Sequence, residues 1–252
     1  MTPAEQADAH DANFIASIAA LADGSASGWV GRHGRIPVAV TGIPAAFFNA
    51  AWLTEPPRHE DVSAALAALR ATGLPFVVHV RSDLPAALAA IAQVGLARTG
   101  VLPCFAMEPR AIPEPPAELA VRRVDATDVG DLHTVTADGF GMSAAVIEKL
   151  YTRKLLEMPQ VRAFLGWVDR RPVATALSFR TGSTLGVYSI GTRPDFRGRG
   201  YGTAMTWHLM ADADPGWTVA VLQASAMGRP IYERMGFSLV REFVDFGDSA
   251  AN

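Results

Sequence analysis

The chain has 252 residues, half of them apolar, and a formal net charge of −3. This length accommodates one large domain or two small ones with an adequate core, and the charge does not indicate a nucleic-acid partner. Cys104 is the only cysteine, which excludes an intramolecular disulfide and suits a reducing compartment. The apolar run 14–22 is too short for a membrane span and follows acidic residues. We therefore expect a cytoplasmic protein without a membrane anchor, either a monomer or a homodimer.

The first part of the chain alternates helical and strand patterns. Periodicity and breakers predict helices at 5–21, 62–70 and 84–94, and strands at 29–40, 47–53, 74–80 and 98–107. Residues 108–116 then hold four prolines in nine positions, which is typical of an extended linker. We therefore divide the chain into an N-terminal domain (1–107), a linker (108–117) and a C-terminal domain (118–252).

The second part predicts a mixed, mainly antiparallel α/β sheet flanked by helices. Its expected strands are 118–124, 161–168, 173–179, 185–192, 218–224 and 237–246, with a hairpin turn at 169–171. Its expected helices are 128–137, broken at 138–141, then 143–156 with Ser143 as N-cap, 204–213, and a short helix before Gly236. Gly236 is expected to end that helix in a left-handed conformation, with Phe237 as a core anchor after it.

Residues 185–203 run from a strand pattern through a turn into a helical pattern. Pro194 ends the strand because it cannot donate to a β-ladder, and three glycines follow at intervals of two: Gly198, Gly200 and Gly202. Glycines let the backbone approach an anion, and a helix N-terminus adds a favourable dipole. Arg197 and Arg199 add positive charge. The stretch predicts a pyrophosphate site, the alternative being a glycine-rich turn with two solvated arginines.

The loop lacks residues that two other phosphate-binding motifs require. A P-loop requires a lysine after its second glycine, and a dinucleotide fingerprint requires a third glycine where Thr203 stands. The pattern Arg-x-x-Gly-x-Gly at 197–202 instead resembles the acyl-CoA loop of the GCN5-related N-acetyltransferases (GNAT). The segment 225–237, a short helix with Tyr232 that ends in Gly-Phe, is similar to the closing element of that family. The resemblance covers about residues 118–247.

The resemblance implies an acyltransferase of the EC 2.3.1 type that moves an acetyl group from acetyl-CoA to a primary amine of a small molecule or protein, without a metal. It implies that pyrophosphate is held by Arg197, Gly198, Arg199, Gly200, Tyr201, Gly202 and Thr203. It implies that pantetheine lies along Ile190, Gly191 and Thr192, and that Tyr232 protonates the leaving thiolate. Tyr232 can instead be a packing residue. Ser225 stands where the family often has asparagine, so it is either a pantetheine contact or a simple helix cap.

The sequence gives less information about the binding site of the acceptor amine. We expect its pocket to be lined by Phe140, Met142 and Tyr188, and the candidates for the general base are Asp138 and Tyr188. His133 and His208 lie in helical patterns and are read as structural. No spacing of His, Cys and acidic residues predicts a metal site.

The two parts of the chain end in the same order of elements. When Gly95 is aligned with Gly236, the loop positions fall on residues 56–61, which contain no glycine and two acids. The N-terminal part is therefore read as a degenerate GNAT-like copy that does not bind pyrophosphate, the alternative being an unrelated α/β domain. A degenerate copy that keeps its fold also leaves open a second function, a CoA-binding sensor or scaffold without turnover.

Overall fold

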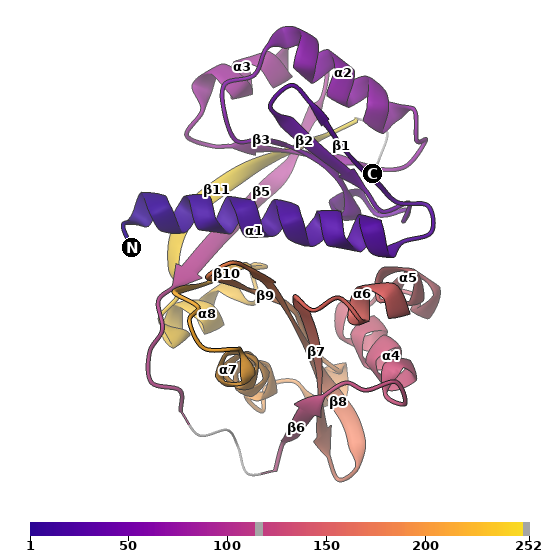
Figure 1. Cartoon of the computed structure of the whole chain (residues 1–252), viewed down its shortest axis with the longest axis vertical. Coiled ribbons are helices and arrows are strands. Elements are labelled where there is room, and N and C mark those ends of the chain that lie inside the picture. The colour runs from indigo at the N-terminus through magenta and orange to yellow at the C-terminus, as the bar shows by residue number, and fades with distance from the viewer. Residues whose placement is uncertain (114–117, 249–252) are drawn as a thin grey trace.

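The structure is a computed structural model that describes residues 1–113 and 118–248, and in it the two halves share one mixed sheet (Figure 1). Its strands are β1 (Trp29–His33), β2 (Ile36–Val40), β3 (Asn49–Leu53), β4 (Val77–Arg81), β5 (Ala97–Met107), β6 (Ala120–Arg123), β7 (Val161–Val168), β8 (Arg171–Thr181), β9 (Thr184–Thr192), β10 (Val219–Gln223) and β11 (Ser238–Gly247). The α-helices are α1 (Pro3–Gly24), α2 (His59–Arg70), α3 (Pro85–Ala92), α4 (Val129–Phe140), α5 (Ala144–Leu150), α6 (Arg153–Leu156), α7 (Tyr201–Asp212) and α8 (Arg229–Met235).

The last strand of each half lies inside the part of the sheet formed by the other half. The strand order is β1-β2-β3-β4-β11-β5-β10-β9-β8-β7-β6, so β11 pairs with β4 and β5 pairs with β10. The two exchanged strands also pair with each other, antiparallel, from Ser238 opposite Ala106 to Gly247 opposite Ala97. Each half thus completes the sheet of the other, which a boundary drawn along the sequence does not reveal.

The mixed, mainly antiparallel sheet predicted from the sequence is confirmed, and the halves repeat one plan. Each half has one parallel pair, β3 with β4 and β9 with β10, and the other pairs in the described sheet are antiparallel. Each then has a helix, a left-handed glycine and a final strand, with φ of +75° at Gly95 and +100° at Gly236. Ile91, which aligns with Tyr232, is fully buried in the core of the N-terminal half.

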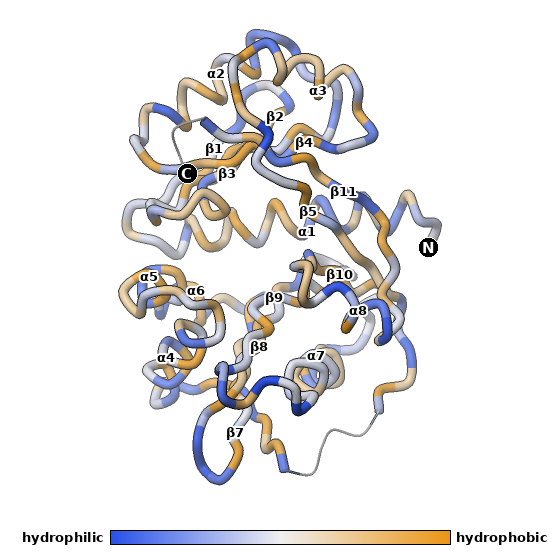
Figure 2. Tube along the Cα trace, turned by 180° about the vertical axis from the view of Figure 1, so that it is seen from behind, coloured by the Kyte–Doolittle hydropathy of each residue, from blue (hydrophilic) through white to orange (hydrophobic). Residues whose placement is uncertain are grey.

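Helix α1 crosses both halves on one face of the sheet (Figures 1 and 2). Thr2 and Glu5 form a capping box at its start, and its buried side chains pack on β2, β3, β5 and β11 as well as on the α4–α6 side of the C-terminal half. Helices α2 and α3 cover the other face of the N-terminal half, and α7 and α8 cover the other face of the C-terminal half. Helix α1 therefore belongs to the core of both halves.

Several predicted boundaries need correction. The helix predicted to break at 138–141 continues to Phe140 and ends at Gly141, whose φ is +65°. The single helix predicted for 143–156 is two, because Thr152 caps α6 by accepting from the Leu155 N–H (3.2 Å). The Thr152 hydroxyl also donates to the Gly24 carbonyl at the end of α1 (2.9 Å). The predicted N-cap Ser143 precedes α5 but makes no side-chain cap bond.

One further correction concerns a connection. Residues 47 and 48, predicted as the start of a strand, belong to a 3₁₀ turn at Ala46–Phe48. Residues 108–113 of the predicted linker have no regular structure, and 114–117 lie outside the described residues. Among the helices that the structure describes, none is long and apolar enough to cross a membrane.

Candidate functional site: a wedge between two parallel strands

Strands β9 and β10 pair over only part of their length, and we call the unpaired region between them the wedge. They pair only at Thr184–Val219, Leu185–Ala220 and Gly186–Val221. Beyond these positions β9 runs on to Thr192 beside β8, and β10 runs on to Gln223 beside β5. In the N-terminal half β3 and β4 stay paired as far as Leu53, the last residue of β3, so that half lacks an equivalent wedge.

A glycine cradle lies at the open end of the wedge. The chain leaves β9, makes a 3₁₀ turn at Pro194–Phe196, and passes through Gly198 (φ +78°) and Gly200 (φ +80°) into α7. A Cβ added to either glycine would meet nothing within 4 Å, so the left-handed backbone, and not lack of space, demands glycine there. The unpaired N–H groups of the first turn of α7 are therefore presented at an exposed loop, the arrangement that binds phosphate groups.

The side chains of the predicted loop residues differ in whether they are exposed or hydrogen-bonded within the protein. Arg199 is exposed and lies over the Phe196 ring, 5.4 Å from its centroid. Arg197 instead donates to the carbonyls of Thr192 (3.2 Å) and Gly139 (2.9 Å), which ties the loop to the end of α4. Tyr201 is buried and donates to Glu118 (2.7 Å), so only its backbone faces the cradle. Gly202 and Thr203 lie partly exposed in the first turn of α7.

The predicted pantetheine segment, Ile190 to Thr192, begins within a β-bulge. Thr175 pairs with Gly191 and Leu177 with Tyr188, so two residues of β9, Ser189 and Ile190, stand opposite one residue of β8. Such a bulge leaves a residue of the strand unpaired and bends the strand locally.

Sequence reasoning missed Ser189 and Tyr151, which set the bulge. Ser189 has a φ of +53°, its carbonyl accepts from the Thr175 hydroxyl (3.0 Å), and its own hydroxyl is hydrogen-bonded to the hydroxyl of Tyr151. Tyr151 is buried, and burial raises its pKa, so it stays protonated. Nothing in the local pattern relates residue 151 to residue 189, because only the packing of α5 and α6 on the sheet brings them together.

Of the predicted acceptor residues, Phe140 lies at the junction of α4 and β9. A Cβ on Gly139 would lie 3.3 Å from the Gly191 Cα, and a Cβ on Gly191 would lie 2.9 Å from the Phe140 ring, so two glycines allow this close approach. Phe140 is 48% exposed over Gly191, whereas Met142 packs into the α4–α6 cluster.

The two candidates for the general base, Asp138 and Tyr188, both interact with other side chains. Asp138 is ion-paired with Arg193 (3.0 Å). The Tyr188 hydroxyl donates to Asn13 (2.6 Å), and burial raises the pKa of Tyr188, which disfavours it as a base. His133 contacts the Tyr151 carbonyl (2.9 Å), and burial lowers the pKa of His208, whose ring packs on Phe164, in keeping with structural roles.

Tyr232 lies on α8 on the α7 side of the sheet. Its ring packs on Phe237, with 5.7 Å between ring centroids, and burial raises the pKa of Tyr232 to about 12. Ser225 accepts from the Gly228 N–H (3.1 Å) just before α8, which matches the cap alternative while leaving its hydroxyl proton free. Among residues 1–113 and 118–248, no three His, Cys, Asp or Glu side chains form a group suited to a metal ion.

Comparison with known proteins shows a related domain and a related fold. The acetyltransferase (GNAT) domain model matches residues 131–215. No curated protein matches the sequence. A GCN5-related N-acetyltransferase from Kribbella flavida is similar in structure, with a TM-score of 0.72 and 21% identity over 94% of this chain and 96% of that one. A GCN5-related N-acetyltransferase from Sphaerobacter thermophilus gives a TM-score of 0.63 and 16% identity over 98% and 93% of the two chains.

A third structure bears on the architecture. A tandem GNAT protein from the clavulanic acid biosynthesis pathway covers 95% of this chain and 95% of its own, with a TM-score of 0.63 and 12% identity. Residues 131–215 therefore match a GNAT domain model, and the chain as a whole has the fold of two-domain GNAT structures.

Proposed function

We propose that this protein is an N-acetyltransferase that binds acetyl-CoA in the C-terminal wedge and transfers the acetyl group to a primary amine of a small molecule or a protein. The observation that carries the proposal is the wedge between β9 and β10 with the left-handed glycines, Gly198 and Gly200, at its open end. An extended thiol arm fits along the part of β9 that does not pair with β10, and a pyrophosphate fits at the helix N-terminus.

The backbone does most of the binding in this proposal. The N–H groups of residues 198–203 hold the pyrophosphate, and Arg199 supplies charge. Arg197 acts differently from its sequence-based assignment, because its guanidinium is bound to the Thr192 and Gly139 carbonyls and shapes the loop. The arm lies along Ile190 to Thr192, where backbone N–H groups polarise the thioester carbonyl. Ser225 retains a hydroxyl proton to offer the arm.

Tyr232 is proposed as the group that stabilises the leaving thiolate. A phenol of pKa about 12 is fully protonated at neutral pH and donates a hydrogen bond throughout the reaction. An ordinary thiol has a pKa of about 8.5, so complete proton transfer to the thiolate is uphill. Tyr232 then acts first as a donor to the developing charge and transfers its proton late. The attacking amine must be neutral, and no side chain is assigned as its base.

The second candidate is a CoA-binding sensor or scaffold without turnover. The N-terminal half supports this alternative, because its β3 and β4 leave no wedge and it nevertheless retains the fold. The fold can therefore persist in this chain without catalysis. The C-terminal half differs in having a tyrosine at 232 where the N-terminal half has the buried Ile91. This difference supports turnover in the C-terminal half.

The deciding experiment combines thiol release with calorimetry. The purified chain is incubated with acetyl-CoA and a library of primary amines, and free thiol is measured. Turnover on any amine supports the transferase, whereas tight CoA binding with none supports the sensor. Calorimetry should give one CoA per chain, since the N-terminal half lacks both the wedge and the cradle. A stoichiometry of two would contradict the proposed inactivity of residues 1–107.

A further inference from the structure

Helix α1 crosses β9 and β10 at the point where their pairing stops. Ala9 of α1 packs on Val219 and Val221 of β10, so the helix lies directly on the last paired positions. We propose that α1 is the spacer that sets the width of the wedge, with His10 and Asn13 as positioning residues. This inference rests on the proposed function, and it gives the N-terminal half a role in a site to which it contributes no cradle.

The contact with β9 is made by Asn13. Its Oδ1 accepts from the Tyr188 hydroxyl (2.6 Å), and its Nδ2 donates to the Phe179 carbonyl (3.1 Å) and the Thr181 hydroxyl (2.8 Å) of β8. Asn13 is fully buried. Its three hydrogen bonds therefore lock β8 and β9 to α1 just beyond the vertex of the wedge.

Gly186 shows how closely α1 sits on this vertex. A Cβ at that position would lie 2.2 Å from Asn13 Oδ1 and 2.3 Å from the Tyr188 ring. Gly186 is also the last β9 residue paired with β10. The helix side chain thus occupies the space that any larger residue at the vertex would need.

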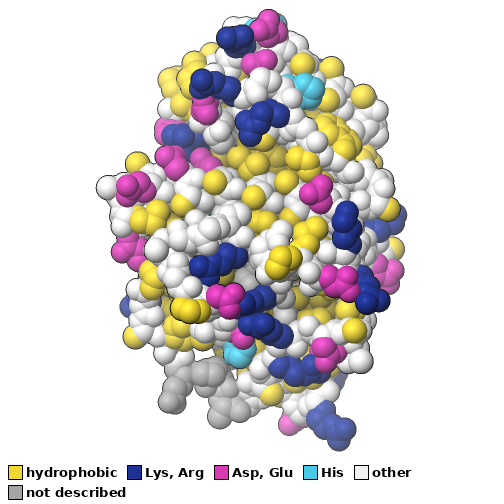
Figure 3. Space-filling model, in the orientation of Figure 1, with side chains coloured by type: hydrophobic (Ala, Val, Ile, Leu, Met, Phe, Trp, Pro, Cys, Tyr) yellow, Lys and Arg dark blue, Asp and Glu magenta, His cyan; other side chains and the backbone are white. Residues whose placement is uncertain are grey.

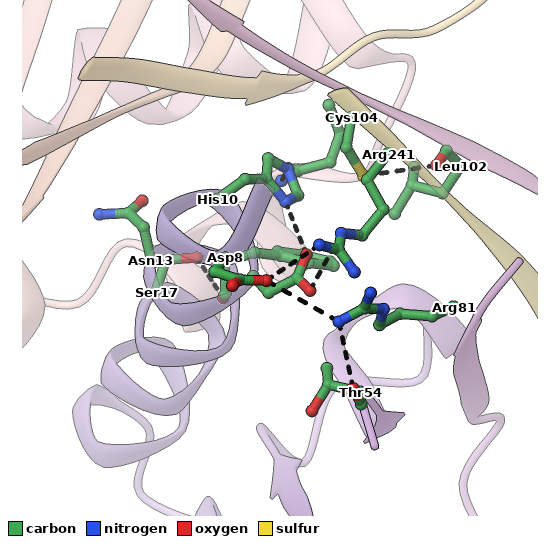
Figure 4. A network of polar contacts seen from close by, with 12 residues as sticks. Asp8, His10, Asn13, Ser17, Thr54, Arg81, Leu102, Cys104 and Arg241 are labelled. Carbon is green, nitrogen blue, oxygen red and sulfur yellow. Dashed lines mark hydrogen bonds and ion pairs between the residues drawn. The ribbon is translucent and has the colours of Figure 1, made fainter. Parts of the chain in front are cut away.

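The contact with β10 is made by His10. Gln223 Nε2 donates to His10 Nε2 (2.6 Å), and His10 Nδ1 faces Asp11 Oδ1 (3.3 Å). Asp11 in turn is ion-paired with Arg241 of β11 (3.3 Å), whose side chain is also buried. Figure 4 shows His10 beside this acid–arginine group, with Asn13 pointing away from Arg81 and Arg241.

A rigid helix fixes the separation of the two anchors. His10 and Asn13 are three residues apart and so lie on neighbouring positions of one helix face. Tyr188 and Gln223 each stand two residues beyond the last paired position of their strand. Because no ladder joins β9 and β10 there, the distance between the anchors on α1 sets the gap into which the thiol arm must fit.

The test uses two ligands of different reach. Coenzyme A spans cradle and wedge, whereas adenosine 3′,5′-bisphosphate lacks the pantetheine arm and one phosphate of the pyrophosphate, so it binds at the cradle alone. Tyr188→Phe and Gln223→Met each remove one anchor bond while nearly conserving volume. Since one hydrogen bond contributes about 1 kcal/mol, each variant should bind CoA roughly 5- to 10-fold more weakly, with affinity for the bisphosphate unchanged.

Ile18→Val is the matched control. Ile18 is buried on the same helix and belongs to the hydrophobic cluster of the N-terminal core. It should lower the melting temperature while leaving the ratio of the CoA and bisphosphate affinities as in the wild type. If the anchor variants keep the wild-type ratio of CoA affinity to bisphosphate affinity, the proposal that α1 is a spacer is wrong. This holds whether neither affinity falls or both fall equally. A wild-type chain that binds neither ligand would instead refute the proposed function.

Discussion

Ser189 is held in a left-handed backbone conformation by bonds to Thr175 and Tyr151. For a residue other than glycine this conformation costs roughly 1–2 kcal/mol, so the surrounding contacts must offset it. The hydroxyls of Thr175 and Tyr151, which come from two other elements, hydrogen-bond to this bulge. The strain therefore lies where the proposed reaction needs a fixed backbone.

Ser189→Ala keeps the strain and removes the hydroxyl, so unfolding free energy should fall by about 1 kcal/mol and kcat should fall with it. Ser189→Gly relieves the strain, so it should melt close to the wild type while kcat still falls. Thermal melts and steady-state rates check both. Tyr151→Phe should not add to Ser189→Ala, because both remove the same bond. Full additivity would show that the pair does not act as a unit.

Tyr232→Phe should lower kcat by roughly 10²- to 10⁴-fold, since the ring stays and only the proton donor is lost. A general acid must be protonated to act, and a pKa raised to about 12 keeps it so across the working range. The wild-type rate should therefore rise as the amine deprotonates and show no descending limb below about pH 11. A near-wild-type kcat with an unchanged pre-steady-state burst would remove Tyr232 from the mechanism.

At the scale of elements, the β9–α7 connection is an exposed loop whose backbone adopts left-handed conformations. Gly198 and Gly200 supply two left-handed residues within three positions. Arg197 ties the same connection to the carboxyl end of α4, beside Phe140. The Arg197 side chain thus connects the proposed cofactor loop to α4, the helix on the proposed acceptor side.

Gly200→Asp should abolish measurable CoA binding, because it places a negative charge and a strained Cβ where the backbone meets phosphate. Gly73→Asp is the matched control. Gly73 also has a positive φ, +66°, and open space around it, but it lies in the turn after α2. The control should lose similar stability and keep CoA affinity by calorimetry. Unchanged affinity in folded Gly200→Asp would refute the loop assignment.

At the scale of the whole molecule, strand exchange makes the halves depend on each other. Residues 118–252 alone would lack β5, whose Phe105 is fully buried in the core of the C-terminal half. Removing β5 would also leave β10 and β11 with open edges.

The fragment 118–252 should therefore be unfolded or aggregated when produced alone, and co-production with 1–117 should restore a soluble complex. Circular dichroism and size-exclusion chromatography distinguish these outcomes. A soluble, folded 118–252 that binds CoA would contradict both this prediction and the proposed role of α1.

The sequence by itself determined the elements and the cradle. Periodicity located most helices and strands, and Gly236 was identified as a left-handed helix cap, because these features depend on neighbours along the chain. The left-handed conformation of Gly198 and Gly200 came from the structure. The sequence did not predict that 143–156 forms two helices, because the break at Thr152 involves a hydrogen bond to the distant Gly24 carbonyl. The exchange of β5 and β11 and the Ser189–Tyr151 pair were also decided only by tertiary structure. So was the anchoring of Tyr188 to Asn13, a contact between residues 175 positions apart. Such pairings follow from how faces pack, and no local pattern encodes which distant surface a face will meet.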